Sequence, residues 1–253
     1  MKKKLWNAIA IVALICGVSV AVSAQGEAGT KATAAAAASV PAAATITATT
    51  APLDLARAAF NAQGGEKFRT VKNMVMKGTV DLFAPNSTQS IPGGFVLVVA
   101  GEKVRLEIDA RPVAFLKQIY NGERYYSSMP GVELPPPSKF GMAVLTRFDQ
   151  PGYSVTAIPD KKKQRGFRIS DADGNVTDFY IDTTSGRVMS FLIPYNGYTF
   201  GTENKKFKDV DGVLISSSFS QRLEMPPGAF FADYNVKDIK LNQPMSDDVF
   251  ALP

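Results

Sequence analysis

The chain has 253 residues, with 28 Lys and Arg, 23 Asp and Glu, one Cys, one Trp and no His. The absence of histidine excludes Ser-His-Asp and Cys-His nucleophile machinery. Together with the single cysteine, it also excludes the common zinc, copper, haem and iron–sulfur ligand sets. The formal charge is +5, and it falls to +2 without the three lysines at positions 2–4, which gives no indication of nucleic-acid binding.

The N-terminus has the pattern of a secretory signal peptide. Three lysines at positions 2–4 precede an apolar run that extends to Val22, and Val22-Ser23-Ala24 forms a small-x-small cleavage site. Cleavage after Ala24 removes these three lysines together with Trp6 and Cys16, and lowers the formal charge from +5 to +2. We therefore expect an exported, periplasmic protein that has no Cys, His or Trp and no disulfide.

Two alternatives for the N-terminus remain open. Cys16 follows Ala13-Leu14-Ile15, which resembles a lipoprotein cleavage box, but such boxes have a small residue directly before the cysteine. The apolar run could also stay attached as an inner-membrane anchor, although it is shorter than the roughly 20 residues that span a bilayer.

Residues 25–52 have the composition of a flexible linker. They include 12 Ala and 6 Thr and no aromatic residue, so they cannot bury enough apolar surface to offset the entropy cost of ordering. We expect residues 53–253 to form one globular domain that is tethered by this linker.

The domain is expected to begin with a helix. Leu55, Ala59 and Ala62 share one helical face, Pro52 lies near the start, and Gly64-Gly65 ends the pattern. A short helical turn over residues 66–70 follows.

After Val71 the hydrophobic period changes from 3.6 to 2, which indicates strands. Short turns such as Asn121-Gly122 and Asp211-Gly212 separate them, so we expect an antiparallel meander that curls towards a barrel because so many strands do not form a flat sheet. The expected strands are 74–82, 95–100, 104–109, 115–120, 124–127, 166–170, 176–182, 187–193, 198–208, 213–221 and 230–241.

One segment interrupts the strands. Leu134-Pro135-Pro136-Pro137 is stiff and extended, and Ser138 follows as a possible N-cap. Phe140, Val144 and Phe148 are spaced i, i+4 and i+8, which predicts a short amphipathic helix over residues 138–148 that covers the concave face of the sheet.

The order of these features resembles the periplasmic outer-membrane lipoprotein carrier family, LolA-like proteins, with LolB and RseB as relatives in fold. The resemblance covers about 200 residues, and it is carried by order and spacing rather than by one specific motif. The segments that carry it are Gly64-Gly65 with Val71-Lys72-Asn73, Phe95-Val96-Leu97, Lys103-Val104-Arg105-Leu106-Glu107, Ile119-Tyr120-Asn121-Gly122-Glu123, Asp173-Gly174-Asn175-Val176, Phe179-Tyr180-Ile181-Asp182, Lys208-Asp209-Val210-Asp211-Gly212-Val213 and 241–250.

The resemblance implies a mainly β fold with a few helices: an unclosed antiparallel half-barrel with an N-terminal helix and a helical lid over its concave apolar face. It also implies, as ligands, the acyl chains of lipoproteins or other lipids, with a membrane-protein donor or acceptor, no cofactor and a monomeric state. The residues expected at the cavity and lid are Met74, Met76, Phe95, Leu97, Leu106, Ile108, Phe140, Val144, Phe148, Phe179 and Phe191. The same residues would serve equally well in an ordinary filled core.

Three other polar patterns are weaker indications of function. Asp171, Asp173 and Asn175 imitate the start of a calcium loop, but Val176 stands where that loop needs glycine, so a hairpin turn is expected. The basic run 161–165 fits a solvated loop or a contact with an acidic partner. Asp247-Asp248 is an isolated acidic pair, and we expect no enzymatic activity.

Two main functional hypotheses follow from the sequence. The first is a lipid-binding protein, and the second is a non-enzymatic envelope interaction or stress-sensing protein.

The export hypothesis gives a direct prediction. The mature protein should begin at Gln25 and be released from cells by osmotic shock, because signal peptidase cuts after the small-x-small site. N-terminal mass analysis of periplasmic material measures this. An intact mass that retains Met1, found in the membrane pellet, would identify the apolar run as an anchor.

Overall fold

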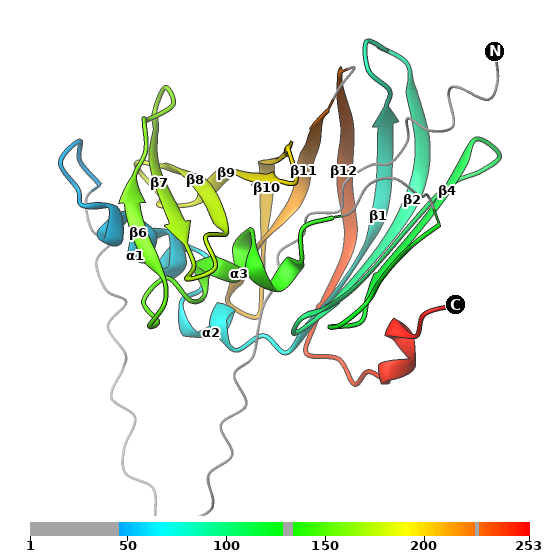
Figure 1. Cartoon of the computed structure of the whole chain (residues 1–253), viewed down its shortest axis with the longest axis horizontal. Helices are drawn as coiled ribbons and strands as arrows, with labels where there is room; N and C mark the ends of the chain where they lie inside the picture. The colour runs from blue at the N-terminus through cyan, green and yellow to red at the C-terminus, as the bar shows by residue number, and fades with distance from the viewer. Residues whose placement is uncertain (1–45, 129–133, 226–227) are drawn as a thin grey trace, which may run out of the picture.

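The structure, a computed structural model, describes residues 46–128, 134–225 and 228–253. Within these residues the chain forms a twelve-stranded antiparallel sheet (Figure 1). The strands are β1 (Asn73–Phe83), β2 (Ser90–Ala100), β3 (Lys103–Ala110), β4 (Ala114–Tyr120), β5 (Tyr125–Ser127), β6 (Ser154–Ala157), β7 (Gln164–Ser170), β8 (Val176–Asp182), β9 (Val188–Tyr195), β10 (Tyr198–Val210), β11 (Val213–Met225) and β12 (Gly228–Leu241). All eleven expected strands are present, and the sequence pattern missed β6.

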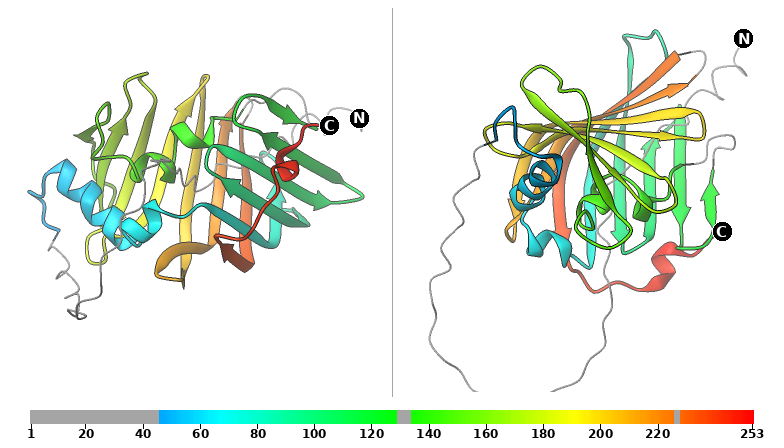
Figure 2. Two further views of the ribbon diagram at one scale, coloured as in Figure 1. Left: turned by 90° about the horizontal axis from the view of Figure 1, so that it is seen from below. Right: turned by 60° about the vertical axis from the view of Figure 1, so that its left-hand side comes forward.

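The sheet is an antiparallel meander in which one pair of neighbouring strands, β1 and β12, lies far apart in the sequence. Its spatial order is β5-β4-β3-β2-β1-β12-β11-β10-β9-β8-β7-β6, so the first and last strands of the chain pair with each other in the middle of the sheet. The edge strands are β5 and β6, which follow each other in sequence. The sheet curves strongly but these two edges do not meet, which confirms the expected unclosed half-barrel (Figures 1 and 2).

The N-terminal helices lie at one end of this sheet. Helix α1 (Pro52–Ala62) has proline in its first turn and buries Leu55, Ala56, Ala59 and Phe60. Leu55 and Ala59 are buried as the sequence pattern predicted, whereas Ala62 is only partly buried. It packs against β6, β7 and α3 (Met142–Leu145). The short helix α2 (Glu66–Arg69) follows the Gly64-Gly65 break and packs against β11.

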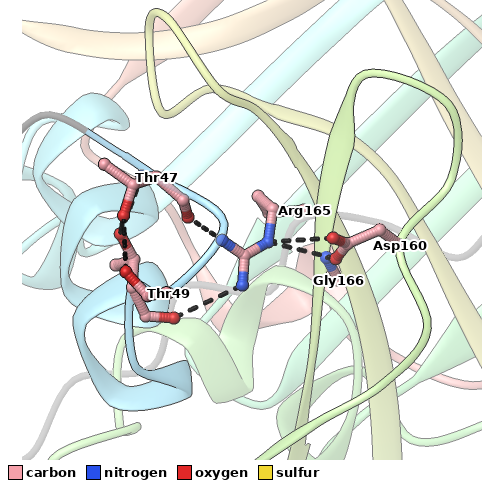
Figure 3. Close-up of polar contacts among 6 residues, drawn as sticks. Thr47, Thr49, Asp160, Arg165 and Gly166 are labelled. Atoms are coloured by element: carbon pink, nitrogen blue, oxygen red, sulfur yellow. Dashed lines mark hydrogen bonds and ion pairs between the residues drawn. The ribbon is translucent and has the colours of Figure 1, made fainter.

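The packed part of the chain begins before the expected domain boundary at residue 53. Ile46 lies against the hydrophobic core. The guanidinium of Arg165, whose side chain is 15% exposed, donates to the carbonyl oxygens of Thr47 and Thr50 and pairs with Asp160 at 3.1 Å (Figure 3). This clamp fixes residues 47–50 to the β6–β7 hairpin. Arg165 comes from the basic run expected to be a solvated loop.

A second, smaller core lies on the outer face of the sheet. Val98 and Ile119 point outward from β2 and β4, and the C-terminal 3-10 turn η3 (Asp247–Phe250) covers them with Phe250. Arg105 donates to the carbonyl of Val249 at 2.9 Å. Figure 2 shows this C-terminal segment running beside β3 and β4. The double-sided burial explains why β2 is apolar on both faces.

A β-bulge in β12, where Lys237 is left out of the pairing, requires glycine at the facing position of β1. The register between β1 and β12 shifts at Lys77/Gly78, and a Cβ on Gly78 would lie 2.1 Å from the carbonyl oxygen of Asn235. Gly78→Ala should therefore lower the free energy of unfolding by about 1–3 kcal/mol or more, as overpacking does. Gly94→Ala is the matched control, because a Cβ there meets nothing closer than 3.8 Å.

Denaturant unfolding of the two variants measures the difference. Equal stability of both variants would contradict the close approach of β1 to β12 at the bulge.

Candidate functional site

The concave face of the sheet is apolar. Residues paired across neighbouring strands point to the same side, so the register places Met76, Leu97 and Leu106 in one row and Phe179 beside Phe191 in another. All of the expected cavity and lid residues are buried and belong to one hydrophobic cluster. They are Met74, Met76, Phe95, Leu97, Leu106, Ile108, Phe140, Val144, Phe148, Phe179 and Phe191.

Aromatic side chains fill much of this interior. Phe167, Phe179 and Phe191 stand on adjacent strands with ring centroids 5.2 Å and 6.0 Å apart, and each is almost completely buried. Further members of the same cluster, which the sequence pattern had not singled out, include Phe200, Leu223, Phe230, Met142 and Leu145. The four strand residues, Phe167, Phe200, Leu223 and Phe230, follow the same alternation as the expected residues, so the alternation itself could have found them.

The chain that joins the two edge strands crosses the concave side. Residues 134–153, here called the crossing segment, lead from β5 at one edge to β6 at the other, and Figure 1 shows α3 between the two arms of the sheet. Phe140, Val144 and Phe148 are each 3% exposed or less. Phe140 meets Tyr195 edge-on, with ring centroids 5.4 Å apart, and Phe148 lies 5.6 Å from Phe60.

The prediction of one continuous helix over residues 138–148 is wrong. The segment consists of a 3-10 turn, η2 (Pro137–Lys139), and the single turn α3, with Phe140 extended between them. Gly141 has φ +63°, and an added Cβ would lie 3.3 Å from the Phe191 ring, so the backbone turns sharply where the sheet comes close. Gly141 caps α3 in place of Ser138, which makes no side-chain cap. The three apolar residues are buried as predicted, without sharing a helix.

Few polar contacts hold the crossing segment to the rest of the protein. The backbone N–H of Gly141 donates to the hydroxyl of Thr177 on β8 at 3.0 Å, in a fully buried position. Arg69 donates to the carbonyl of Thr146 at 2.9 Å and pairs with Asp149 at 2.8 Å. Apart from these contacts and one exposed ion pair, Lys139 with Asp173, the segment is attached by apolar contact.

An exposed ion pair adds one further tie. Lys139 lies 2.8 Å from Asp173, a residue of the β7–β8 turn. Its hydrogen bond lowers the pKa of Asp173 and raises the pKa of Lys139. Both side chains are about half exposed or more, so the pair contributes little to stability. The turn itself is the expected hairpin, because Asp171 accepts from the backbone N–H groups of Asp173 and Asn175.

The interior is closed in this conformation. A void of about 40 Å³ lies between β3, β4 and residues 134–137, and another of about 20 Å³ lies near α2 and the β10–β11 turn. Such volumes hold a few water molecules at most. Each void is lined by a buried glutamine, Gln118 and Gln63 respectively, which the sequence pattern did not single out. A long acyl chain fits only if the crossing segment moves.

A larger hollow lies on the opposite face of the sheet. A groove of about 950 Å³ runs over the outer side of β9–β12, between the β6–β7 and β1–β2 hairpins. Its floor is small or polar at Ser190, Gly201 and Ser220, and Leu192 and Phe231 add apolar surface. Charged side chains of both signs line it: Lys161, Lys162, Lys205, Arg222, Glu203, Glu224 and Asp233.

The described residues contain no group of three or more acidic, His or Cys side chains that could hold a metal ion. No helix within the same residues is long and apolar enough to span a membrane.

Comparison with solved structures identifies the fold. A LolA superfamily protein from Nitrosomonas europaea superimposes with a TM-score of 0.54 at 10% identity, covering 81% of this chain and 99% of that one. A putative outer membrane lipoprotein-sorting protein domain from Vibrio parahaemolyticus has a TM-score of 0.45 at 13% identity over 79% and 95% of the two chains. A DUF1329 family protein from Desulfovibrio piger has a TM-score of 0.46 at 11% identity over 80% and 98%.

No family model and no curated protein matches the sequence. The first superposition shows that the chain has the LolA-like fold, the fold expected from the resemblance.

The buried contact of the crossing segment gives a testable prediction. Thr177→Val keeps the shape of the side chain but leaves the Gly141 N–H without an acceptor, so the free energy of unfolding should fall by about 1–3 kcal/mol. Amide hydrogen exchange at residues 141–145 should accelerate more than exchange in the strands. Thr202→Val is the control, because the buried hydroxyl of Thr202 has no partner among the described residues. Equal effects of the two variants would contradict a specific tie at Gly141.

Proposed function

We propose that this protein is an exported, non-enzymatic binding protein of the periplasm that holds acyl chains of a lipoprotein or another lipid against the concave face of its half-barrel. The main support for this proposal is the way in which the crossing segment is attached to the sheet. The apolar side chains of the segment enter the core of the concave face. Among the described residues, its polar contacts with other segments are one buried hydrogen bond to the sheet, the two contacts of Arg69 and one exposed ion pair. Displacing it therefore breaks few polar contacts.

The energetics of exchange support this proposal. Burial of an acyl chain is worth about 0.8 kcal/mol per methylene, so sixteen carbons contribute on the order of 10 kcal/mol before the costs of binding. Moving Phe140, Val144 and Phe148 away from the sheet exposes apolar surface, and an incoming chain covers the surface of the sheet that they leave. The interior thus stays filled in both states, by protein side chains in one and by lipid in the other.

The N-terminal sequence supports the proposed periplasmic location of the protein. Export requires the signal peptide. In our proposal, the Ala/Thr-rich residues 25–45 act as a tether that extends to residues 47–50, which Arg165 holds. The transport of lipoproteins towards the outer membrane, with a membrane-protein donor or acceptor, is the process that fits such a carrier. We propose that it works as a monomer.

A second candidate function rests on the outer groove. A non-enzymatic interaction or stress-sensing protein would use a protein-binding surface, and the groove over β9–β12 is much larger than either interior void. Arg222→Ala with Lys205→Ala would then abolish capture of a protein partner and leave lipid uptake unchanged. In the lipid-carrier proposal, lipids should co-purify with the wild-type protein from periplasmic material.

The movable crossing segment predicts a specific pattern of hydrogen exchange. Residues 134–148 should exchange faster than the central strands in the free protein and become more protected or reorganised when an acylated lipopeptide is added. Phe140→Ser with Val144→Ser should leave the sheet folded and change the uptake of an acyl probe. Phe250→Ser, which removes an equally buried side chain from the outer face, should leave uptake unchanged.

The opposite result would contradict a movable crossing segment. If residues 134–148 are as protected as the strands and do not respond to lipopeptide, the segment is part of a permanent core. The double variant should then cost about 2–5 kcal/mol per large side chain and threaten folding.

A further inference from the structure

One apolar row of the concave face leads to a buried amide, Gln118 on β4, beyond which the register continues to Ser127 on the edge strand β5. The strand register aligns Ile239 on β12, Met76 on β1, Leu97 on β2, Leu106 on β3 and Gln118 on β4. All five side chains are buried, and the first four are apolar. Because neighbouring strands are about 4.8 Å apart, the row spans about 19 Å, which is comparable to the length of a long acyl chain.

The side-chain oxygen of Gln118 is an unused hydrogen-bond acceptor. The residue is 2% exposed, and Oε1 has no partner among the described residues. It lines the void of about 40 Å³, which is otherwise apolar apart from the hydroxyls of Tyr120 and Tyr125. Tyr120 already donates to the carbonyl of Gly122 at 2.8 Å. None of the described residues around this void carries a charge.

The cover of the void is the part of the crossing segment that can leave most easily. It consists of Leu134 and Pro135–Pro137, here called the proline roof. Three consecutive prolines have no N–H, so they cannot donate to the neighbouring edge strand β5, and the roof rests on the sheet through apolar contact. Moving the proline roof away from the sheet therefore breaks no hydrogen bond donated by the backbone of these three residues.

We propose that Gln118 is a specificity-determining residue, which accepts a hydrogen bond from the amide N–H at the head of an N-acylated ligand whose chain lies along the row from Leu106 to Ile239. This inference rests on the proposed lipid-binding function and narrows it to a ligand class. The unpaired Oε1 needs a donor, and a neutral amide N–H supplies one. A carboxylate or phosphate head would bring a second acceptor and an unpaired charge into an apolar site, which is unfavourable.

Two matched competitors test this, N-palmitoylglycine methyl ester and the analogue in which oxygen replaces the amide N–H. Each competes with a fluorescent acyl probe on the full mature chain. The wild-type protein should bind the amide about tenfold more tightly than its oxygen analogue, because a site built around a hydrogen bond rejects a ligand that lacks the donor. Free palmitate should compete more weakly than the amide.

Gln118→Leu should bind both competitors equally, and it should melt no lower than wild type because it removes an unpaired buried polar group. Gln118→Met, of similar length, is the second variant should the leucine variant fail to fold. Thr202→Val, the control, also removes an unpartnered buried group but does not line this void, so it should keep the preference for the amide.

Equal binding of the two competitors by wild type, or a preference that survives in Gln118→Leu and Gln118→Met, would overturn the role of Gln118 while leaving lipid binding intact. Failure of all acyl compounds to compete or bind would instead overturn the proposed function, and this inference with it.

Discussion

The position of the two sheet edges constrains the rest of this protein. Because β1 pairs with β12 in the middle of the sheet, the strands that remain at the edges are β5 and β6, which are consecutive in the chain. The open side of the half-barrel is the direct route between them, and the crossing segment takes it. Strand order thus places a connection where it can cover the concave face, and the sequence of the crossing segment decides how firmly that connection is held.

That sequence combines strong apolar burial with weak polar attachment. Phe140, Val144 and Phe148 enter the core, whereas three prolines remove backbone donors at the β5 end, and Gly141 makes a single buried hydrogen bond to Thr177. Apolar contact is not directional, so lipid methylenes can replace it. A hydrogen-bonded strand at the same place would have closed the barrel and fixed the interior permanently. The outer face is different, because η3 covers its small core and Arg105 holds the carbonyl of Val249.

The sequence predicted most of the strands because alternation and turn residues are local signals. It did not predict the pairing of β1 with β12, which joins residues 148 to 167 positions apart. It also misjudged the crossing segment, since i, i+4 spacing outweighed the effect of Gly141 on the backbone. In β4, Phe115 points outward and Gln118 inward, the reverse of what their polarity suggests, so the amide at the end of the apolar row became visible only with the register in place.

The central claim is that an acyl chain enters between the crossing segment and the sheet. The most direct measurement is methyl NMR of methionine-labelled mature protein with an acyl chain that carries a nitroxide near its middle. Met76 and Met142 lie on the two sides of the closed interior, and Met245 packs on the outer face. If lipid enters there, the Met76 and Met142 methyl signals should broaden strongly and the Met245 signal should change little. Broadening at Met245 alone, or at none of the three, would contradict entry of lipid into the half-barrel.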